Sequence, residues 1–179
     1  MKMKRIVLVE PSIEYEGQVL TYKNEFLENG DIMAGTAGLN AAASIQAWLT
    51  NIKKNEKEDT VAAGWVPATT FLCIREEDNY LLGMVDIRHC LNDSLREIGG
   101  HIGYSVRRSQ WGKGYAKEML KQALIFCEKL GLEQVLVTCD KTNYASAKVI
   151  LFNNGILEKE IQHEDERIQH YWISIGNFE

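Results

Sequence analysis

The sequence predicts an α/β fold in which a central mixed, mostly antiparallel sheet is flanked by helices. Strand-like apolar segments alternate with segments of helical periodicity along the chain. Residues 101–106 and 134–139 read as strands joined by a helix, and we expect them to run parallel because such crossovers link parallel strands. Residues 80–89 and 101–106 follow one another without a helix between them, so we expect this pair to be antiparallel.

The N-terminal part predicts one strand and two helices. Residues 6–9 are a short apolar strand. In 12–29 apolar residues recur at spacings of four, three and four, and Gly30 follows as a stop signal. A second apolar stripe predicts a helix over 38–54, and the glycine-rich segment 30–38 connects the two.

The rest of the chain predicts three strands, a helix, a strand, a helix and two closing strands. The strongest signal is the helix 114–130, which has a continuous apolar face and is followed by Gly131. The nearly all-apolar strand 134–139 is typical of a strand that is covered on both faces. The other predicted elements are 69–75, 80–89, 101–106, 143–153, 157–162 and 169–175.

Length and composition limit the classes of function. At roughly 150 residues per domain, the 179 residues predict a single domain, 1–179. The net charge of −5 argues against nucleic-acid and anionic-membrane partners. No apolar run approaches the ~20 residues that cross a bilayer, and no signal peptide is evident, so we expect a cytoplasmic protein. Four cysteines without metal-ligand spacing predict reduced thiols and no metal.

The segment HIGYSVRRSQWGKGYA, residues 101–116, carries the chemistry. It reads as a strand, a loop and the start of a helix. Gly112 and Gly114 leave the backbone free of side chains, and the first helical turn adds N–H donors and a partial positive charge. Three cations stand in or beside this loop: Arg107, Arg108 and Lys113. The pattern predicts a cradle for a diphosphate, the alternative being a solvated surface loop.

Three classes of phosphate-binding loop compete for this segment. The Walker loop needs GxxxxGK followed by Ser or Thr, and GKGY has neither the spacing nor the hydroxyl. A dinucleotide fingerprint would fit Asp140 at the end of the next strand, but it needs a third glycine, and residue 117 is lysine. It also needs a glycine turn close to its strand, whereas five residues separate Val106 from Gly112. The third class is an acyl-CoA cradle.

The loop WGKGYA, residues 111–116, resembles the pyrophosphate loop of the GCN5-related N-acetyltransferases, the GNAT superfamily. Gly114 and Ala116 fill the last two places of the pattern Arg/Gln-x-x-Gly-x-Gly/Ala, and Trp111 departs from it at the first. Residues 138–158 resemble the second coenzyme-contacting region of the same superfamily. The segments LVEPS, VPATTF and MVDIRHCLND also resemble a bacterial subgroup of predicted acetyltransferases, so the resemblance spans nearly the whole chain.

The resemblance implies the GNAT fold, with acetyl-CoA as co-substrate and no metal. It implies that the strand before the loop meets the pantetheine arm through Tyr104, Ser105 and Val106. The loop would hold the pyrophosphate by backbone N–H groups, over Trp111, Gly112, Lys113, Gly114, Tyr115 and Ala116. Arg107 or Arg108 would reach a phosphate, the alternative being a surface charge. Asn143 and Ser146 would contact the pantetheine, the alternative being helix capping.

The reaction implied is direct attack of a primary amine on the thioester carbonyl in a ternary complex. Glu97 and His101 are the candidate bases, because both lie at the start of the strand 101–106. An exposed loop charge and a structural histidine are the alternatives for these two residues. Many members of the superfamily carry an acidic tyrosine seven residues after the asparagine, but this chain has Ile150 there. The proton donor is therefore not identified.

The acceptor is expected to be an amine-bearing small molecule or a protein amine. The two N-terminal helices and the 30–38 loop are expected to shape its site, because the coenzyme occupies the C-terminal half. A non-catalytic acyl-CoA-binding or sensing module is the alternative function, consistent with Ile150. The strands within 157–175 leave an edge that a second copy of the chain would cover, so a homodimer is a further expectation.

Overall fold

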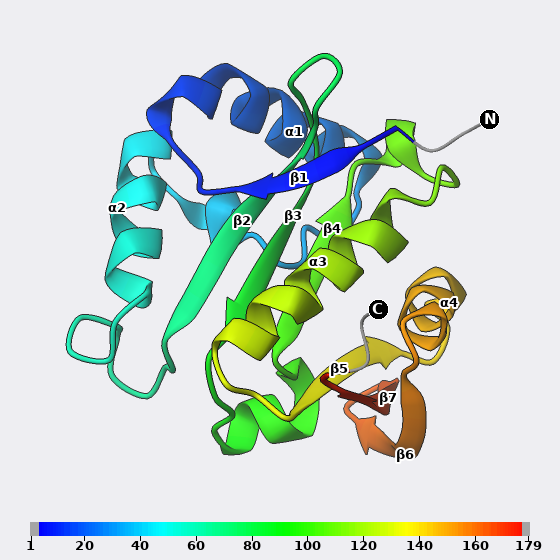
Figure 1. The fold of residues 1–179 in the computed structure, drawn as a ribbon. Coiled ribbons are helices and arrows are strands. Elements are labelled where there is room, and N and C mark those ends of the chain that lie inside the picture. The colour runs from blue at the N-terminus through cyan, green and yellow to red at the C-terminus, as the bar shows by residue number, and fades with distance from the viewer. Residues whose placement is uncertain (1–3, 177–179) are drawn as a thin grey trace.

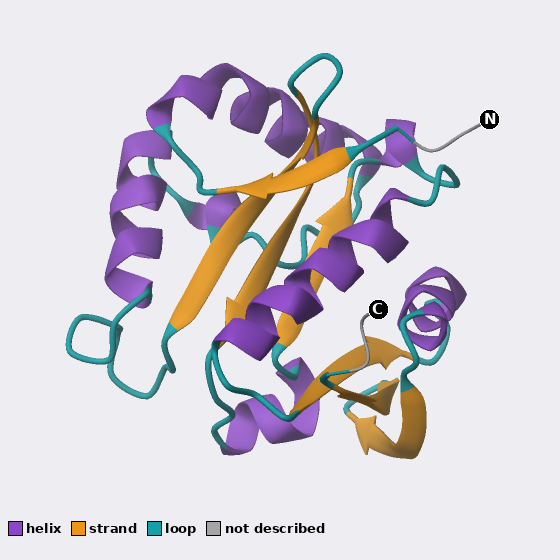
Figure 2. Cartoon of the chain, viewed as in Figure 1, coloured by secondary structure: helices purple, strands orange, loops and turns teal. Residues whose placement is uncertain are grey.

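The strands of the protein form two antiparallel sheets, seen in Figure 1 and Figure 2. The coordinates are a computed structural model, which describes residues 4–176. The first sheet has the order β1 (Ile6–Val9), β2 (Ala68–Arg75), β3 (Tyr80–Arg88), β4 (Ile102–Val106). The second has the order β5 (Gln134–Asp140), β7 (Glu166–Ser174), β6 (Ile156–His163). The predicted α/β class, mostly antiparallel strands flanked by helices, is confirmed, but the strands form two antiparallel sheets instead of one central mixed sheet.

Helices cover both faces of the first sheet (Figure 1). α1 (Glu16–Asn29) and α2 (Ile45–Asn55) pack on one face, and α3 (Tyr115–Lys129) packs on the other. α4 (Tyr144–Phe152) lies beside α3 and β5. Four short turns complete the elements: η1 (Ile13–Tyr15), η2 (Leu39–Ala41), the π-helical turn η3 (Leu95–Gly99) and η4 (Arg108–Gln110).

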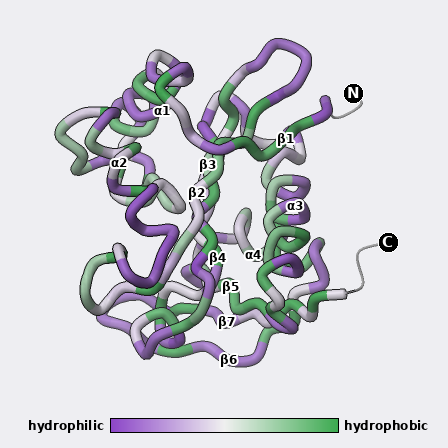
Figure 3. The backbone as a smooth tube through the Cα atoms, turned by 60° about the vertical axis from the view of Figure 1, so that its left-hand side comes forward, coloured by the Kyte–Doolittle hydropathy of each residue, from purple (hydrophilic) through white to green (hydrophobic). Residues whose placement is uncertain are grey.

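Two apolar cores follow from this arrangement. One lies under α1 and α2, where Val19, Tyr22 and Phe26 of α1 pack against Leu72 and Met84 of the sheet. The other lies between the sheets, α3 and α4. In Figure 3 the backbone is hydrophobic along the central strands and hydrophilic in the outer loops. The helix spacing read from the sequence therefore gave the correct buried stripe of α1.

The helix predicted over 38–54 begins later than expected. Gly38 adopts the left-handed conformation and is followed by the single turn η2. The α-helix starts only after Ser44, whose hydroxyl accepts a hydrogen bond from the N–H of Ala47. This side-chain cap fixes the first turn, and apolar periodicity alone does not reveal it.

The parallel pairing predicted for 101–106 and 134–139 is wrong, because β4 and β5 belong to different sheets. The two segments meet at one point, where the N–H of His101 donates to the carbonyl of Leu136 at 2.7 Å. Past this point no strand of the described chain pairs with the outer edge of β4. The crossover helix therefore does not bring β5 into the first sheet, and within the described residues β4 presents an open backbone edge.

Residues 4–176 contain no helix long and apolar enough to cross a membrane. Cys73, Cys127 and Cys139 are buried free thiols, and Cys90 is an exposed one. Burial raises the pKa of Cys73 to about 12, so this thiol stays protonated near neutral pH.

Candidate active site

The loop between η4 and α3 presents a row of backbone N–H groups. Gly112 and Gly114 have φ angles of 73° and 85°, in the left-handed region that glycine tolerates best. Nothing lies within 4 Å of the place where a Cβ on Gly112 would stand, so the loop is open there. Within the part of the chain that the structure describes, the N–H groups of residues 112–116 have no protein acceptor. These donors lie at the positive end of α3, where the sequence predicts an anion cradle, and the name cradle is kept for residues 112–116.

Side chains stiffen the cradle from outside. The indole N–H of Trp111 donates to the carbonyl of Val106 at 2.6 Å, which ties the loop to the end of β4. The guanidinium of Arg108 lies 4.9 Å from the Trp111 ring centroid and pairs with Asp31, with its Nε 2.9 Å from a carboxylate oxygen. The ammonium of Lys113 donates to Gln110 at 3.0 Å. Arg108 and Lys113 thus lie beside the loop with exposed charges, where an added phosphate can compete for them.

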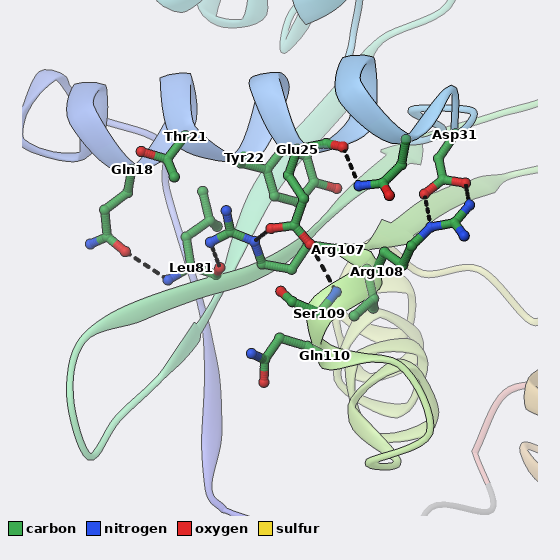
Figure 4. A network of polar contacts seen from close by, with 12 residues as sticks. Gln18, Thr21, Tyr22, Glu25, Asp31, Leu81, Arg107, Arg108, Ser109 and Gln110 are labelled. Carbon is green, nitrogen blue, oxygen red and sulfur yellow. Dashed lines mark hydrogen bonds and ion pairs between the residues drawn. The ribbon is translucent and has the colours of Figure 1, made fainter.

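Arg107 points away from the loop and is buried beneath α1, as Figure 4 shows. Its Nε donates to the carboxylate of Glu25 at 2.7 Å, and its Nη1 donates to the carbonyl of Leu81 at 3.1 Å. The other oxygen of Glu25 accepts from the N–H of Ser109 at 2.8 Å. In this structure Arg107 anchors η4 to α1 rather than facing the cradle, although its charge was expected to meet a phosphate.

The residues predicted to meet the pantetheine lie on both sides of the gap between β4 and β5. Tyr104 on β4 reaches α4, where its hydroxyl lies 2.8 Å from the Ser146 hydroxyl. Asn143 caps α4, its side-chain oxygen accepting from the N–H of Ser146 at 3.0 Å. Burial raises the pKa of Tyr104, so this phenol stays protonated. Tyr104, Asn143 and Ser146 are therefore brought together, and the capping alternative for Asn143 is present in the structure.

Ser105 points to the opposite face of β4. Its hydroxyl donates to the carbonyl of Ala34 at 2.5 Å and lies 2.7 Å from the Tyr22 hydroxyl. Thr36 is fixed as well, since its carbonyl accepts from the Trp48 indole at 2.8 Å. These bonds hold the glycine-rich loop against β4. A Cβ on Gly35 would stand only 2.1 Å from the carbonyl oxygen of Gly103, so this loop approaches the strand as closely as glycine permits.

The two candidate bases occupy different places. His101 is buried at the junction of β4 and β5, and its Nδ1 accepts from the N–H of Leu136 at 2.9 Å. Burial and the nearby charges of Arg96 and Arg88 lower its pKa to about 4, so the imidazole is neutral. Glu97 is exposed on η3 and lines a hollow of about 330 Å³ with Lys159 and others. The structure records no contact between Glu97 and His101 within residues 4–176.

A larger cavity, of about 500 Å³, opens on the α1–α2 side of the sheet. Its lining includes the 33–38 loop, Trp65 and Asn92, and its charged members are Asp86 and Arg88 of β3. Asp86 is 6% exposed; one oxygen accepts from the Thr70 hydroxyl at 2.9 Å, and the other lies 3.1 Å from Nε of Arg88. Burial raises the pKa of Asp86 even though Arg88 opposes this shift. The cavity thus holds a nearly buried carboxylate beside an available guanidinium.

A family model described as the acetyltransferase (GNAT) domain matches residues 5–152. The chain belongs to the GNAT acetyltransferase family. The match covers most of the chain, including both sides of the gap between β4 and β5. No curated protein matches the sequence significantly.

Solved GNAT structures share the fold along the full chain. The ribosomal-protein-S5-alanine acetyltransferase of Vibrio fischeri is 16% identical, with 100% of this chain and 97% of that chain covered at a TM-score of 0.66. A ribosomal L7/L12 α-N-protein acetyltransferase in complex with coenzyme A is 17% identical. The comparison covers 95% of this chain and 94% of that chain at a TM-score of 0.65. The spermidine/spermine N-acetyltransferase of Vibrio cholerae is 14% identical. The comparison covers 94% of this chain and 93% of that chain at a TM-score of 0.65. At these identities the likeness establishes the fold alone.

The residues of this GNAT domain fit the coenzyme that the family uses. The free N–H groups of 112–116 suit a pyrophosphate, and the open edge of β4 suits an amide-containing arm. Among residues 4–176, no cluster of three or more His, Cys, Asp or Glu side chains is placed to bind a metal ion.

Sequence reasoning missed Asp86 as a functional candidate in this GNAT domain. The signal was present, because Asp86 is a lone acid within the apolar strand LLGMVDI and is followed two residues later by Arg88. Residues two apart on a strand share a face, so the pair was predictable, but the cavity above it was not. The 33–38 loop and Asn55 of α2, both from the region where the acceptor site was expected, line this cavity.

Proposed function

We propose that the protein transfers the acetyl group of acetyl-CoA to a primary amine by direct attack in a ternary complex. The observation that carries this proposal is the row of N–H groups at 112–116, which have no acceptor among residues 4–176, next to a strand whose outer edge pairs with no described strand. The thioester supplies an activated carbonyl: the ammonium loses one proton before attack, the C–N bond forms, the nitrogen loses a second proton and the C–S bond breaks. One of these two protons replaces the one that the departing thiolate gains, and the other goes to solvent. The chain has to bind both substrates and handle these two protons.

The coenzyme would lie along the predicted contacts. The N–H groups of 112–116 would hold the pyrophosphate, while Arg108 and Lys113 supply positive charge beside it. The backbone of β4 from Tyr104 to Val106 would bind the pantetheine arm and offer an N–H to the developing oxyanion. Asn143 and Ser146 would form the opposite wall of the gap.

The acceptor amine would enter the cavity above β3, with Asp86 as the group that takes its proton. A carboxylate with a raised pKa is a better base than an ordinary one, and burial raises the pKa of Asp86. We propose Asp86 for this role ahead of Glu97 and His101. Glu97 is exposed at a different hollow, and Nδ1 of His101 already accepts from Leu136.

Tyr104 would donate a proton to the departing thiolate. Its hydroxyl is held at 2.8 Å by Ser146, one helical turn before Ile150 on the same helix. The superfamily position for the acid is Ile150, so a phenol reaching α4 from β4 would serve in its place. The raised pKa of Tyr104 keeps the proton on the phenol until a basic thiolate is present.

Calorimetry with acetyl-CoA, followed by a thiol-release assay against a panel of primary amines, tests the proposal. We expect saturable binding of acetyl-CoA and thiol release that depends on both the amine and the protein. Binding without thiol release for any amine would favour the acyl-CoA-sensing alternative. Stabilisation by NAD and not by coenzyme A would favour the dinucleotide loop.

A further inference from the structure

The cavity above β3 has a simple charge pattern. Within the described residues, Asp86 and Arg88 are the charged side chains in its lining, and they carry opposite charges. The rest of the lining is apolar or neutral, and it includes Met33, Trp65 and Leu95. Trp65 is 67% exposed, so an aromatic surface lies free at the rim.

The guanidinium of Arg88 is held in place but not saturated. Its Nη1 donates to the carbonyl of Gly99 at 3.3 Å, and its Nε faces Asp86. A Cβ on Gly103 would lie 3.2 Å and 3.4 Å from Nη1 and Nη2, so the group lies against β4. Among residues 4–176 Nη2 has no protein acceptor, and the side chain, which is 23% exposed, lines the cavity. Arg88 therefore retains donors that a ligand can use.

Asp86 and Arg88 connect the cavity with β4, the strand that is proposed to carry the thioester. Asp86 of β3 is the register partner of Gly103 of β4. Gly103 has no side chain, and the space above it is taken by the guanidinium of Arg88 and the backbone of Gly35. An amine bound at Asp86 is one strand away from the outer edge of β4, and a group bound at Arg88 lies beside β4.

The opposite charges of Asp86 and Arg88 determine which class of amine suits the cavity. Asp86 and Arg88 neutralise each other, so a ligand that brings only positive charge meets the guanidinium uncompensated. A polyamine suits a cavity with several unpaired carboxylates, which this cavity lacks. A ligand with one ammonium and one carboxylate can pair with both side chains and leave no net buried charge.

Building on the proposed function, we propose that the acceptor is a free amino acid with an apolar side chain. Its ammonium binds Asp86, its carboxylate binds Arg88, and its side chain packs toward Met33 and Trp65. Before attack the ammonium gives one proton to Asp86, which passes it to solvent. The nitrogen loses a second proton as the amide forms, and this proton balances the one that Tyr104 gives to the departing thiolate. Arg88 sets specificity and takes no part in the proton transfer.

The test compares amino acids with their decarboxylated analogues as acceptors, phenylalanine with phenethylamine and leucine with isoamylamine. For the wild type we expect kcat/KM to be at least about tenfold higher for the amino acid of each pair. Arg88→Gln should bring the ratio close to one, and Arg88→Lys should leave an intermediate ratio. Arg88→Gln leaves Asp86 unpaired, so the double variant Asp86→Asn, Arg88→Gln is a second test. Calorimetry should show that the acetyl-CoA complex of this double variant no longer binds either amino acid. Arg96→Gln, on the exposed surface of η3, should keep the wild-type ratio.

Several outcomes would overturn the inference while leaving the proposed function intact. These are equal rates within each pair, faster turnover of spermidine or of a leucine-initiated dipeptide, and a ratio that depends on Arg96 instead of Arg88. A protein that binds acetyl-CoA but acetylates neither amino acid also overturns it. Failure to bind acetyl-CoA would instead overturn the proposed function, and this inference with it.

Discussion

The backbone N–H of Leu136 on β5 donates a 2.9 Å hydrogen bond to Nδ1 of His101, at the point where β4 and β5 separate. The N–H of His101 completes the junction by donating to the carbonyl of Leu136 at 2.7 Å. The imidazole of His101 therefore accepts the hydrogen bond that a backbone carbonyl of β4 would accept in a continuous sheet, and β4 and β5 separate directly after it. The Thr138 hydroxyl, bonded to the carbonyl of Ile98, ties η3 to the same region of β5. The gap that is proposed to hold the coenzyme starts at this junction.

This junction predicts acid sensitivity. The pKa of His101 is about 4 in the folded protein, against roughly 6.5 in the unfolded chain, so the unfolded chain binds more protons between these values. The free energy of unfolding should have its full value above pH 6.5 and decrease as the pH drops toward 4. The expected decrease between pH 7 and pH 5 is about 2 kcal/mol. Urea unfolding at several pH values measures this. His101→Asn keeps an acceptor atom but does not titrate, so its loss over the same range should be smaller; equal losses would contradict the prediction.

The cradle predicts a specific effect at Gly112. Gly112→Ala places a Cβ in open space at a φ of 73°, which costs about 1 kcal/mol of backbone strain and covers the N–H groups. We expect at least a tenfold weaker Kd for acetyl-CoA, measured by calorimetry. Gly131→Ala is the matched control, because it has a φ of 78° and equally open surroundings beyond the far end of α3. Similar binding losses in both variants would argue against the cradle.

The two arginines after β4 predict unequal stability effects. Glu25→Gln leaves the buried Arg107 without its carboxylate, and we expect a loss of about 3 kcal/mol. Asp31→Asn removes the partner of Arg108, which is half-exposed, so the loss should stay below about 1 kcal/mol. Chemical denaturation of both variants measures the difference. Equal losses would mean that the pairs in Figure 4 do not differ in burial in solution.

The proposed acid predicts a kinetic signature. Tyr104→Phe removes the hydroxyl bonded to Ser146 and should lower kcat by at least about tenfold, with little change in KM for acetyl-CoA. The thiol-release assay gives both constants. Tyr144→Phe on α4 is the control, since Tyr144 is exposed and should keep the wild-type kcat. An unchanged kcat in Tyr104→Phe would remove the phenol from the reaction.

Local patterns determined most of the elements and the prediction of an anion cradle. Apolar spacing located α1 and α3, and glycines at 112 and 114 ahead of a helix indicated an anion-binding loop. These features depend on residues close together in the chain, and such short-range constraints are readable from sequence. For the same reason the family resemblance, carried by contiguous motifs, was sufficient to give the fold that the family model then confirmed.

Only the tertiary structure decided what each polar side chain faces. Arg107 and Arg108 are adjacent, yet one is buried against Glu25 and the other is exposed beside Trp111. Asp86 became a candidate only when the 33–38 loop and β3 enclosed a cavity around it, and the separation of β4 from β5 depended on an imidazole bonded to a residue 35 positions away. Burial and long-range hydrogen bonding depend on which segments meet in space, and a periodic pattern contains no information about that.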